Sequence, residues 1–179
     1  MRDVNEINTE RLRLRRLRMS DAQRVALLCG DPAVARMILR APLPYLPVAA
    51  EGWIMTLAAR QPLAHEFVFA ADLADEGLIG CIGAHRSGEG EFEIGYWFGK
   101  PYWGRGYASE TLDAFLAPAR RLGQLEAGHF VDNPASGRVL QKGGFAYTGE
   151  TKPMFSLARG ERVLCKRMRD AANEGTLAA

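Results

Sequence analysis

The sequence has few cysteines and no long hydrophobic run. Its 179 residues include three cysteines, Cys29, Cys81 and Cys165, which lie far apart and form no CxxC pair. This spacing predicts neither a zinc site nor a redox site, and we expect three small buried apolar side chains in a reducing compartment. No run of about 18 apolar residues occurs, so we expect no membrane-spanning helix. The polar start MRDVNEINTE lacks the apolar segment of a signal peptide, which predicts a cytoplasmic protein.

A strong excess of charge of one sign is also missing. The chain has 23 lysines and arginines against 21 aspartates and glutamates, a formal net charge of +2 at pH 7. A charge this small argues against binding to nucleic acid or to an anionic membrane surface. The length and the hydrophobic content of 47% suit one α/β domain. Since repeats and low-complexity linkers are absent, we predict a single domain over residues 1–179, with loose termini over residues 1–8 and 171–179.

The periodicity of apolar residues predicts a mixed sheet interrupted by helices. Alternating patterns predict strands over residues 9–19, 65–71, 78–85, 92–98, 125–131, 145–148 and 162–166. Helical spacing and capping residues predict helices over residues 20–29, from residue 32 onward, and over residues 51–60, 108–122 and 134–142. The second to fourth strands form an antiparallel meander, and the strand at 125–131 returns parallel to the fourth after a helix. This order fits neither a doubly wound fold nor a TIM barrel.

The strand at residues 9–19 alternates leucine with arginine. Leu12 and Leu14 share one face, so we expect a half-buried strand with a solvated arginine face. No aromatic residues interleave the arginines, which disfavours nucleic acid binding. Ser20 and Asp21 then cap the next helix.

Prolines and an asparagine set further boundaries. Asp31-Pro32 opens a short helix, and the three prolines within residues 41–47 exclude helix and central strand there. Pro118 should kink helix 108–122 or tighten its last turn. Asn133 is the expected N-cap of helix 134–142.

A glycine-bearing loop, residues 101–106, joins a strand to a helix. Gly104 and Gly106 allow close approach of the backbone to a ligand, and the first amides of a helix bind phosphate oxygens. The amides from Trp103 to Ala108 are the candidates, with Arg105 as an added charge. The same pattern also fits a plain tight turn. It matches neither a P-loop nor a dinucleotide fingerprint.

Several motifs together resemble one family. The segments typical of the RimJ/RimL-type GNAT acetyltransferases are Gly95-Tyr96-Trp97 with Tyr102–Glu110, Asn133–Ser136 with Gly143-Gly144-Phe145 and Gly149, and the opening Thr9–Arg15 with Asp21-Ala22. The resemblance extends from about residue 9 to residue 168. Three departures are Pro101, where the superfamily has Gln or Arg, the Gly143-Gly144 pair, and Pro118.

The resemblance implies an α/β fold with a mixed, mostly antiparallel sheet of about six or seven strands and about four helices, splayed between the fourth and fifth strands. It implies acetyl-CoA as co-substrate and no metal, with pantetheine paired to residues 94–98 and the pyrophosphate on the glycine loop. The cofactor-binding residues that it implies are Ile94, Tyr96, Trp97, Phe98, Trp103, Gly104, Arg105, Gly106, Tyr107, Ala108, Asn133 and Ser136. A homodimer is common among such relatives.

Acetyl transfer to an amine needs a group that accepts a proton. Glu93 is the first candidate for this base and Glu91 the second, while both also fit solvent-facing charges on a strand. Ser136 is the candidate proton donor to the leaving thiolate, or a plain first-turn helix residue. No cysteine neighbours these motifs in the sequence, so we expect direct transfer rather than a cysteine acyl-enzyme.

The sequence leaves several candidates for the acceptor amine. The resemblance favours the α-amine of a protein N-terminus, while polyamines, aminoglycosides, amino acids and other small amines are alternatives. We expect the walls of the acceptor site to come from residues 41–47, residues 49–60 and the last two strands. Tyr45 and Trp53 either line this site or pack in the core. The rival functions are a non-catalytic acyl-CoA sensor and an interaction domain with a degenerate pocket.

Overall fold

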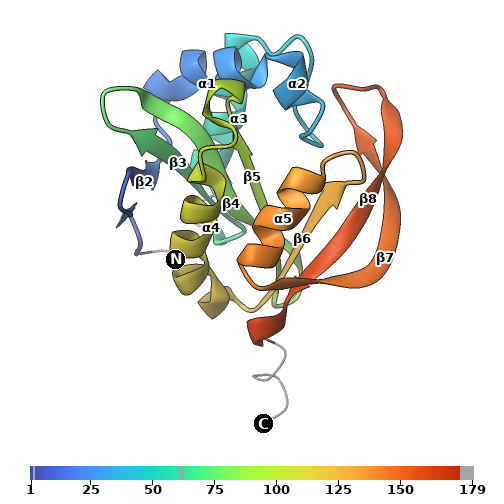
Figure 1. The fold of residues 1–179 in the computed structure, drawn as a ribbon. Coiled ribbons are helices and arrows are strands. Elements are labelled where there is room, and N and C mark those ends of the chain that lie inside the picture. Colours follow the sequence, from blue (N-terminus) through green and yellow to red (C-terminus); the bar gives the residue numbers. More distant parts are fainter. Residues whose placement is uncertain (2, 61–62, 174–179) are drawn as a thin grey trace.

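Eight strands form one sheet in the computed structural model, which describes residues 1, 3–60 and 63–173 (Figure 1). The strands are β1 (Glu6–Asn8), β2 (Leu12–Arg16), β3 (Glu66–Leu73), β4 (Gly77–Gly88), β5 (Glu91–Phe98), β6 (Gln124–Phe130), β7 (Phe145–Ser156) and β8 (Glu161–Asp170). They run in the order β1-β2-β3-β4-β5-β6-β8-β7, and neighbours are antiparallel except for β5 and β6. The predicted class, a mixed and mostly antiparallel sheet, is confirmed, with eight strands in place of six or seven.

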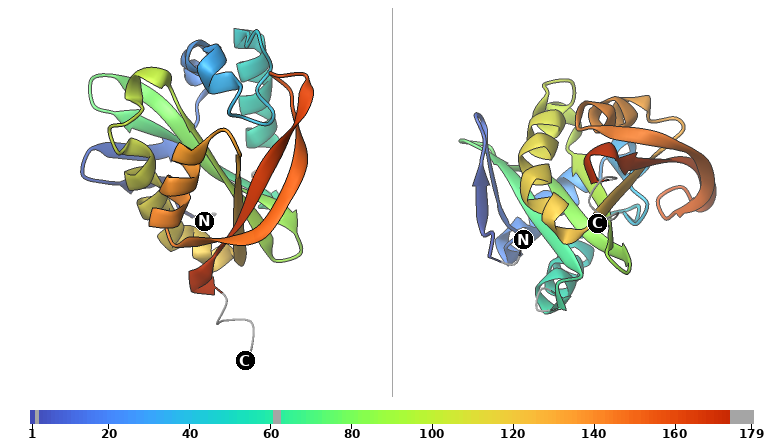
Figure 2. Two further views of the ribbon diagram at one scale, coloured as in Figure 1. Left: turned by 45° about the vertical axis from the view of Figure 1, so that its right-hand side comes forward. Right: turned by 90° about the horizontal axis from the view of Figure 1, so that it is seen from below.

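Helices cover both faces of this sheet (Figure 2). They are α1 (Ala22–Cys29), α2 (Pro32–Ala35), α3 (Pro47–Arg60), α4 (Tyr107–Ala119) and α5 (Pro134–Lys142). α4 and α5 lie on one face, and α1 and α3 lie on the other. Buried Phe69 of β3 meets Phe115 of α4 edge-on, with 5.8 Å between the ring centroids, so a large part of the core lies between the sheet and α4.

The ends of the chain and the edge of the sheet differ from the expectations. Within the start predicted to be loose, Glu6–Asn8 pair with β2 because Ile7 packs against the core. β7 and β8 are much longer than predicted, since they pair with each other as a hairpin whose β7 residues are exposed on both faces and lack apolar alternation. At the other end, Ala171–Asn173 form a 3-10 turn, and residues 174–179 lie outside the described residues.

The proline and asparagine signals act as expected. The side chain of Asp31 accepts a hydrogen bond from the Ala33 amide at 2.8 Å and caps α2. α4 ends one residue after Pro118 and tightens into a 3-10 turn. α3 begins at Pro47, earlier than predicted, because proline is compatible with the first turn of a helix.

The sheet opens between β5 and β6. The two strands pair only where Glu91–Ile94 lie beside Gln124–Ala127. Beyond this point β6 continues along β8 as far as Phe130, while Gly95–Phe98 of β5 pair with β4 alone. The predicted splay between the fourth and fifth predicted strands is therefore present.

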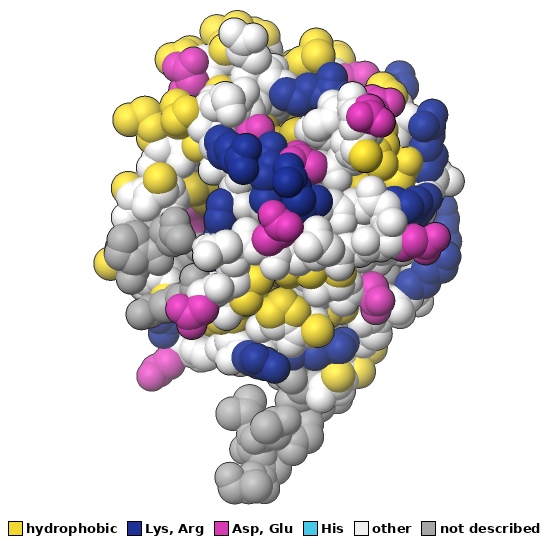
Figure 3. Space-filling view, turned by 90° about the vertical axis from the view of Figure 1, so that its left-hand side faces the viewer, with side chains coloured by type: hydrophobic (Ala, Val, Ile, Leu, Met, Phe, Trp, Pro, Cys, Tyr) yellow, Lys and Arg dark blue, Asp and Glu magenta, His cyan; other side chains and the backbone are white. Residues whose placement is uncertain are grey.

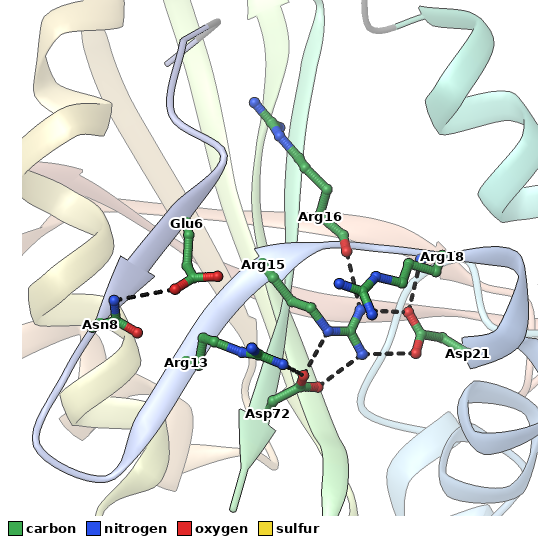
Figure 4. A network of polar contacts seen from close by, with 8 residues as sticks. All are labelled: Glu6, Asn8, Arg13, Arg15, Arg16, Arg18, Asp21 and Asp72. Carbon is green, nitrogen blue, oxygen red and sulfur yellow. Dashed lines mark hydrogen bonds and ion pairs between the residues drawn. The ribbon is translucent and has the colours of Figure 1, made fainter.

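A buried arginine ties β2 to β3 and to the start of α1 (Figure 4). Arg15 is 8% exposed, and its guanidinium contacts the carboxylates of Asp21 and Asp72. Asp21, followed by Asp72, raises the pKa of Arg15. Burial opposes ionisation of Asp21, but Arg15 and the Arg18 amide outweigh burial and hold the pKa of Asp21 below its usual value.

This network corrects two expectations. The arginine face of β2 is not uniformly solvated, because Arg15 is enclosed by two carboxylates. Asp21 forms no side-chain cap of α1, because its carboxylate is occupied by Arg15 and the Arg18 amide.

The surface on the side of β1 and β2 carries mixed charge. Lysine and arginine side chains lie beside aspartate and glutamate side chains there and form no continuous basic surface in this view (Figure 3). This arrangement agrees with the small net charge of the sequence. Among the described residues, no helix combines the length and apolar character that a membrane crossing requires.

The Arg15 network generates a stability prediction. Arg15→Met should lower the free energy of unfolding by about 3–5 kcal/mol, because buried Asp21 loses its arginine partner and Asp72 keeps only the half-exposed Arg13. Arg13→Met is the matched control: Arg13 contacts the same Asp72, but its side chain is 50% exposed, so its loss should cost about 1 kcal/mol or less. Urea denaturation followed by circular dichroism measures both. Equal losses in the two variants would contradict this account.

Candidate functional site

A cavity of about 910 Å³ passes through the opening between β5 and β6. On the α5 face of the sheet it is lined by Tyr96 and Ser136, and on the α3 face by Glu93 and Trp53. One continuous space thus reaches both faces of the sheet, which suits a reaction between two ligands that enter from different sides.

The glycine loop forms one wall of this cavity. Gly104 and Gly106 have positive φ angles of 73° and 82°, a conformation that favours glycine, and Gly106 directly precedes α4. The first amides of α4, at Tyr107 and Ala108, have no carbonyl partner within the helix and carry the positive end of its dipole. The loop therefore offers the features of an anion-binding site.

Trp103 and Arg105 differ in their relation to this wall. The Trp103 amide donates to the Lys100 carbonyl at 3.2 Å, and its indole Nε1 donates to the Phe98 carbonyl at 2.7 Å, so its backbone amide is already used. Trp103, Gly104, Gly106, Tyr107 and Ala108 line the cavity, whereas Arg105 is exposed and does not. The predicted added charge of Arg105 thus lies outside the cavity lining.

A brace that the sequence analysis missed holds this loop. Glu110 in the first turn of α4 accepts hydrogen bonds from the Thr9 hydroxyl at 2.5 Å and from Arg11 Nε at 2.7 Å. Arg11 also donates to the Arg105 carbonyl at 3.0 Å and stacks over Tyr107 at 4.5 Å. The start of β2 therefore fixes the glycine loop, and two motifs that are about a hundred residues apart form one structural unit.

Tyr96 and Ser136 meet on the α5 face. Asn133 caps α5, with its side-chain oxygen 3.3 Å from the Ser136 amide, as predicted. The Tyr96 hydroxyl lies 2.8 Å from Ser136 Oγ and donates to the Ser136 carbonyl at 3.0 Å. Burial raises the pKa of Tyr96 to about 12, an effect that the hydrogen bond with Ser136 opposes. The Tyr96 hydroxyl therefore stays protonated next to Ser136, at the opening between β5 and β6.

Carboxylates and one imidazole form a row on the α3 face. The strand register pairs Glu66 with His85, His85 with Glu93, and Glu93 with Glu126. Residues directly opposite each other on paired strands point to the same face. Glu66, His85 and Glu93 all line the cavity. Sequence spacing gave no sign of this row because it depends on the register of four strands.

Arginines contact each carboxylate of the row. Arg167 donates to Glu93 Oε1 at 2.5 Å and lies 3.4 Å from Glu126, which Arg169 also contacts at 2.9 Å. Burial works against the charge of Arg167, but its carboxylate contacts outweigh burial and raise its pKa. His85 and then Arg60, whose Nη1 is 3.0 Å from Glu66, hold the pKa of Glu66 below its usual value.

Of the other residues predicted to bind the cofactor or act as a base, all but one line the cavity. Ile94, Trp97, Phe98 and Asn133 line it, in accord with their expected place beside the splay. Glu91, the second candidate base, is not among the lining residues.

The expected acceptor walls also contribute. Tyr45 and Trp53 line the cavity and pack against the core at the same time. α3 adds Gly52 and Thr56 to this side.

The three cysteines correct the sequence analysis. All are buried, as expected, but Cys29, Cys81 and Cys165 also line the cavity, because the fold brings α1, β4 and β8 together around it. Burial raises the pKa of each thiol, most strongly for Cys29 and Cys81. A thiol that resists ionisation is a poor nucleophile. Direct transfer therefore stays an expectation, and its reason is the resistance of these thiols to ionisation, because the cysteines do lie at the cavity.

A polar bridge joins the β7–β8 turn to the segment after α2, in which residues 37–42 line the cavity. The Leu157 amide, in the turn between β7 and β8, donates to the Leu39 carbonyl at 2.9 Å. Arg159 of the same turn donates to the Arg36 carbonyl at 2.8 Å and to Asp132 Oδ2 at 2.9 Å. The hairpin is thereby fastened to the loop that follows α2.

Comparisons with known proteins agree with this architecture. Residues 11–146 match the acetyltransferase (GNAT) domain family. The uncharacterized N-acetyltransferase YoaA of Bacillus subtilis is 30% identical over 149 residues, which cover 80% of this chain and 84% of YoaA. The chain therefore belongs to the GNAT acetyltransferase family.

Solved structures of RimJ and RimL type share the fold. RimJ of Mycobacterium smegmatis, in complex with CoA-disulfide, superposes with a TM-score of 0.78 at 20% identity, covering 97% of this chain and 91% of RimJ. The acetyltransferase of Salmonella typhimurium that modifies the N-terminal serine of ribosomal protein L7/L12 has a TM-score of 0.78 at 16% identity, covering 92% of this chain and 98% of its own.

The buried thiols generate a chemical prediction. In the native protein at pH 7, all three cysteines should react slowly with a disulfide reagent, because their thiolate fractions are small. In denaturant all three should react at once. Time-resolved thiol titration in both states makes the measurement, and rapid native reaction of any one cysteine would revive the acyl-enzyme route.

Proposed function

We propose that this protein transfers the acetyl group of acetyl-CoA directly to a primary amine, and that the α-amine of a protein N-terminus is the preferred acceptor. The observation that carries the proposal is one cavity in which an unpaired strand edge, a helix N-terminus and a carboxylate row converge. A domain without a ligand has no use for leaving Gly95–Phe98 unpaired on the β6 side.

The cofactor half of the proposal uses the α5 side of the opening. The pantetheine amides pair with the free edge of β5 between Ile94 and Phe98, as an added half-strand. The pyrophosphate binds the amides of Gly104–Ala108, which the Glu110 brace holds in place. Asn133 and Ser136 at the start of α5 lie beside the acyl end. Trp103 borders the loop end of this half, whereas Trp97 faces the α3 side together with Glu93 and Gly95.

The acceptor half uses the α3 side. Glu93 and its neighbours in the row attract an ammonium group toward the splay, and Tyr45 and Trp53 supply apolar walls. The ammonium first loses one proton to a base on this side, and the neutral amine then attacks the thioester carbonyl, so that the C–N bond forms and the C–S bond breaks. The Ser136–Tyr96 hydroxyl pair, whose hydrogen bond is 2.8 Å long, gives a proton to the leaving thiolate and regains one from the attacking nitrogen, which leaves an amide, CoA and one proton on the base.

The chemistry of the amine supports an N-terminal acceptor. Free α-amines have a pKa of about 7.7–8.0, whereas lysine side chains have about 10.4, so an α-amine is partly neutral at pH 7. The fold shared with the Salmonella enzyme supports the same class. The bridge between the β7–β8 turn and the loop after α2 favours a thin, extended chain end or a small amine over a lysine on a folded surface.

The proposed cofactor site generates a prediction about ligand binding. Acetyl-CoA and CoA at about 100 times their Kd should each stabilise the protein by about 2.7 kcal/mol, while ATP at the same concentration should not. Thermal denaturation with each ligand measures this. Stabilisation by ATP alone, or by none of the three at millimolar concentration, would contradict the proposed cofactor site.

The hydroxyl pair generates a kinetic prediction. Ser136→Ala should lower kcat about tenfold, equivalent to about 1.4 kcal/mol of transition-state stabilisation, with little change in KM for acetyl-CoA. Tyr96→Phe should produce a similar loss, because the two hydroxyls act as one unit. Steady-state kinetics by thiol release tests both, and a loss confined to KM would assign Ser136 to positioning.

The acceptor bridge generates a specificity prediction. Arg159→Ala should raise KM for a peptide acceptor and leave the Kd of CoA unchanged, because it frees the hairpin from Asp132 and the Arg36 carbonyl. Arg162→Ala, an exposed change on the same hairpin, is the control. Equal acceptor KM values in the two variants would show that the bridge does not shape the acceptor site.

A further inference from the structure

His85 is the imidazole in the row of carboxylates on the α3 face. Glu66 is contacted by Arg60, Glu93 by Arg167, and Glu126 by both Arg167 and Arg169. Each of these carboxylates thus has an oxygen occupied by a guanidinium. A neutral imidazole keeps a lone pair on one ring nitrogen that can accept a proton. Among the described residues, the imidazole is therefore the member of the row whose acceptor atom is not used by an arginine in this way.

The two ring nitrogens of His85 have different surroundings. Nδ1 is buried, forms no hydrogen bond within the described part of the chain, and lies 3.7 Å from Glu66 Oε1. The Glu66 side chain is only 11% exposed, while that of His85 is 36% exposed and lines the cavity. A small approach of the two side chains would let Nδ1 donate to Glu66, which leaves the lone pair on Nε2.

Nε2 lies over Gly83 of β4, beside the Val68 side chain. A Cβ atom added to Gly83 would be 3.2 Å from His85 Nε2 and 2.8 Å from Val68 Cγ2, so the ring leans along β4 over Gly83. Gly83 pairs with Gly95, the first residue of β5 beyond the contact with β6, and a Cβ on Gly95 would meet only open space. Nε2 thus lies over the strand position next to the open space at Gly95, where the splay begins.

We propose that His85 accepts the proton of the acceptor amine through Nε2, that Glu66 positions the imidazole, and that Glu93 holds the ammonium through charge. This rests on the acetyl transfer proposed above. The charged groups that face His85 are Glu66 from β3, Glu93 from β5 and Arg60 from α3. The role first given to Glu93 thereby passes to its cross-strand neighbour.

The proton balance of the reaction is complete with these groups. An ammonium acceptor gives one proton to Nε2, and the neutral amine attacks the thioester carbon. The C–N bond forms and the C–S bond breaks, and the second nitrogen proton neutralises the thiolate by way of the Ser136–Tyr96 pair. The imidazolium then releases its proton to solvent, which leaves an amide, CoA and one free proton.

Kinetics of three variants test the assignment. The probe acceptor is a short peptide with an N-terminal serine. His85→Ala and His85→Gln should lower kcat about 10²- to 10⁴-fold and leave the Kd of CoA unchanged. Free imidazole should restore part of the activity of His85→Ala, and more basic substituted imidazoles should restore more. Glu93→Gln, the matched comparison in the same row, should mainly raise the peptide KM.

Glu66 has a separate test as a positioning residue. Glu66→Gln should lower kcat, free imidazole should not restore it because His85 still occupies its place, and Glu66→Asp should retain more activity. A purely structural role would not distinguish Asp from Gln in kcat at equal thermal stability.

A measurement without any acceptor completes the test. ¹⁵N spectra of the three histidine rings, with His85 assigned through His85→Gln, should show the Nδ1–H tautomer. The Nε2–H tautomer, or wild-type kcat in His85→Gln, would overturn the proposal. Failure of the wild-type protein to bind acetyl-CoA would instead overturn the proposed function, and the Kd measurement separates the two.

Discussion

β5 and β6 remain hydrogen-bonded only from Glu91 to Ile94, and beyond that point their backbone groups need other partners. β8 pairs with the opposite edge of β6 as far as Phe130, so it does not replace β5 on the edge that faces the opening. β5 keeps β4 on one side, and on the other side only the Phe98 carbonyl has a described partner, the Trp103 indole. A strand edge left free inside the protein is a ready template for an extended ligand with amide groups. The proposed cofactor site follows from this one interruption of pairing.

The same interruption separates the two halves of the proposed reaction. Side chains alternate along β5, so Tyr96 points toward α5 while Glu93 and Gly95 face α3. The hydroxyl pair that serves the leaving thiolate and the row that serves the amine thus lie on opposite faces. One group can then take the proton from the amine nitrogen while another delivers a proton to the thiolate sulfur, on the two sides of the acyl carbon.

Sequence patterns predicted the elements that have strong periodicity or capping signals. The meander, α4, α5 and the glycine loop carry such local signals, and the resemblance to the GNAT motif indicated where the sheet splays. The features that the sequence did not predict depend on contacts between distant segments. The Arg15 network, the Thr9–Arg11–Glu110 brace and the cysteines at the cavity all join elements far apart in the chain. The sequence did not indicate His85 as a site residue for the same reason. Strand register places Glu66 and Glu93 beside it, and no short motif encodes that register.

The central claim is that the free edge of β5 and the glycine loop together form one CoA site. Glycine amides report on it directly, because Gly95, Gly104 and Gly106 lie on its two halves and Gly149 and Gly160 lie on the β7–β8 hairpin. Addition of CoA to ¹⁵N-labelled protein should shift the amide signals of the first three and leave the last two in place. Shifts of the loop glycines without Gly95, or shifts confined to the hairpin, would contradict the account.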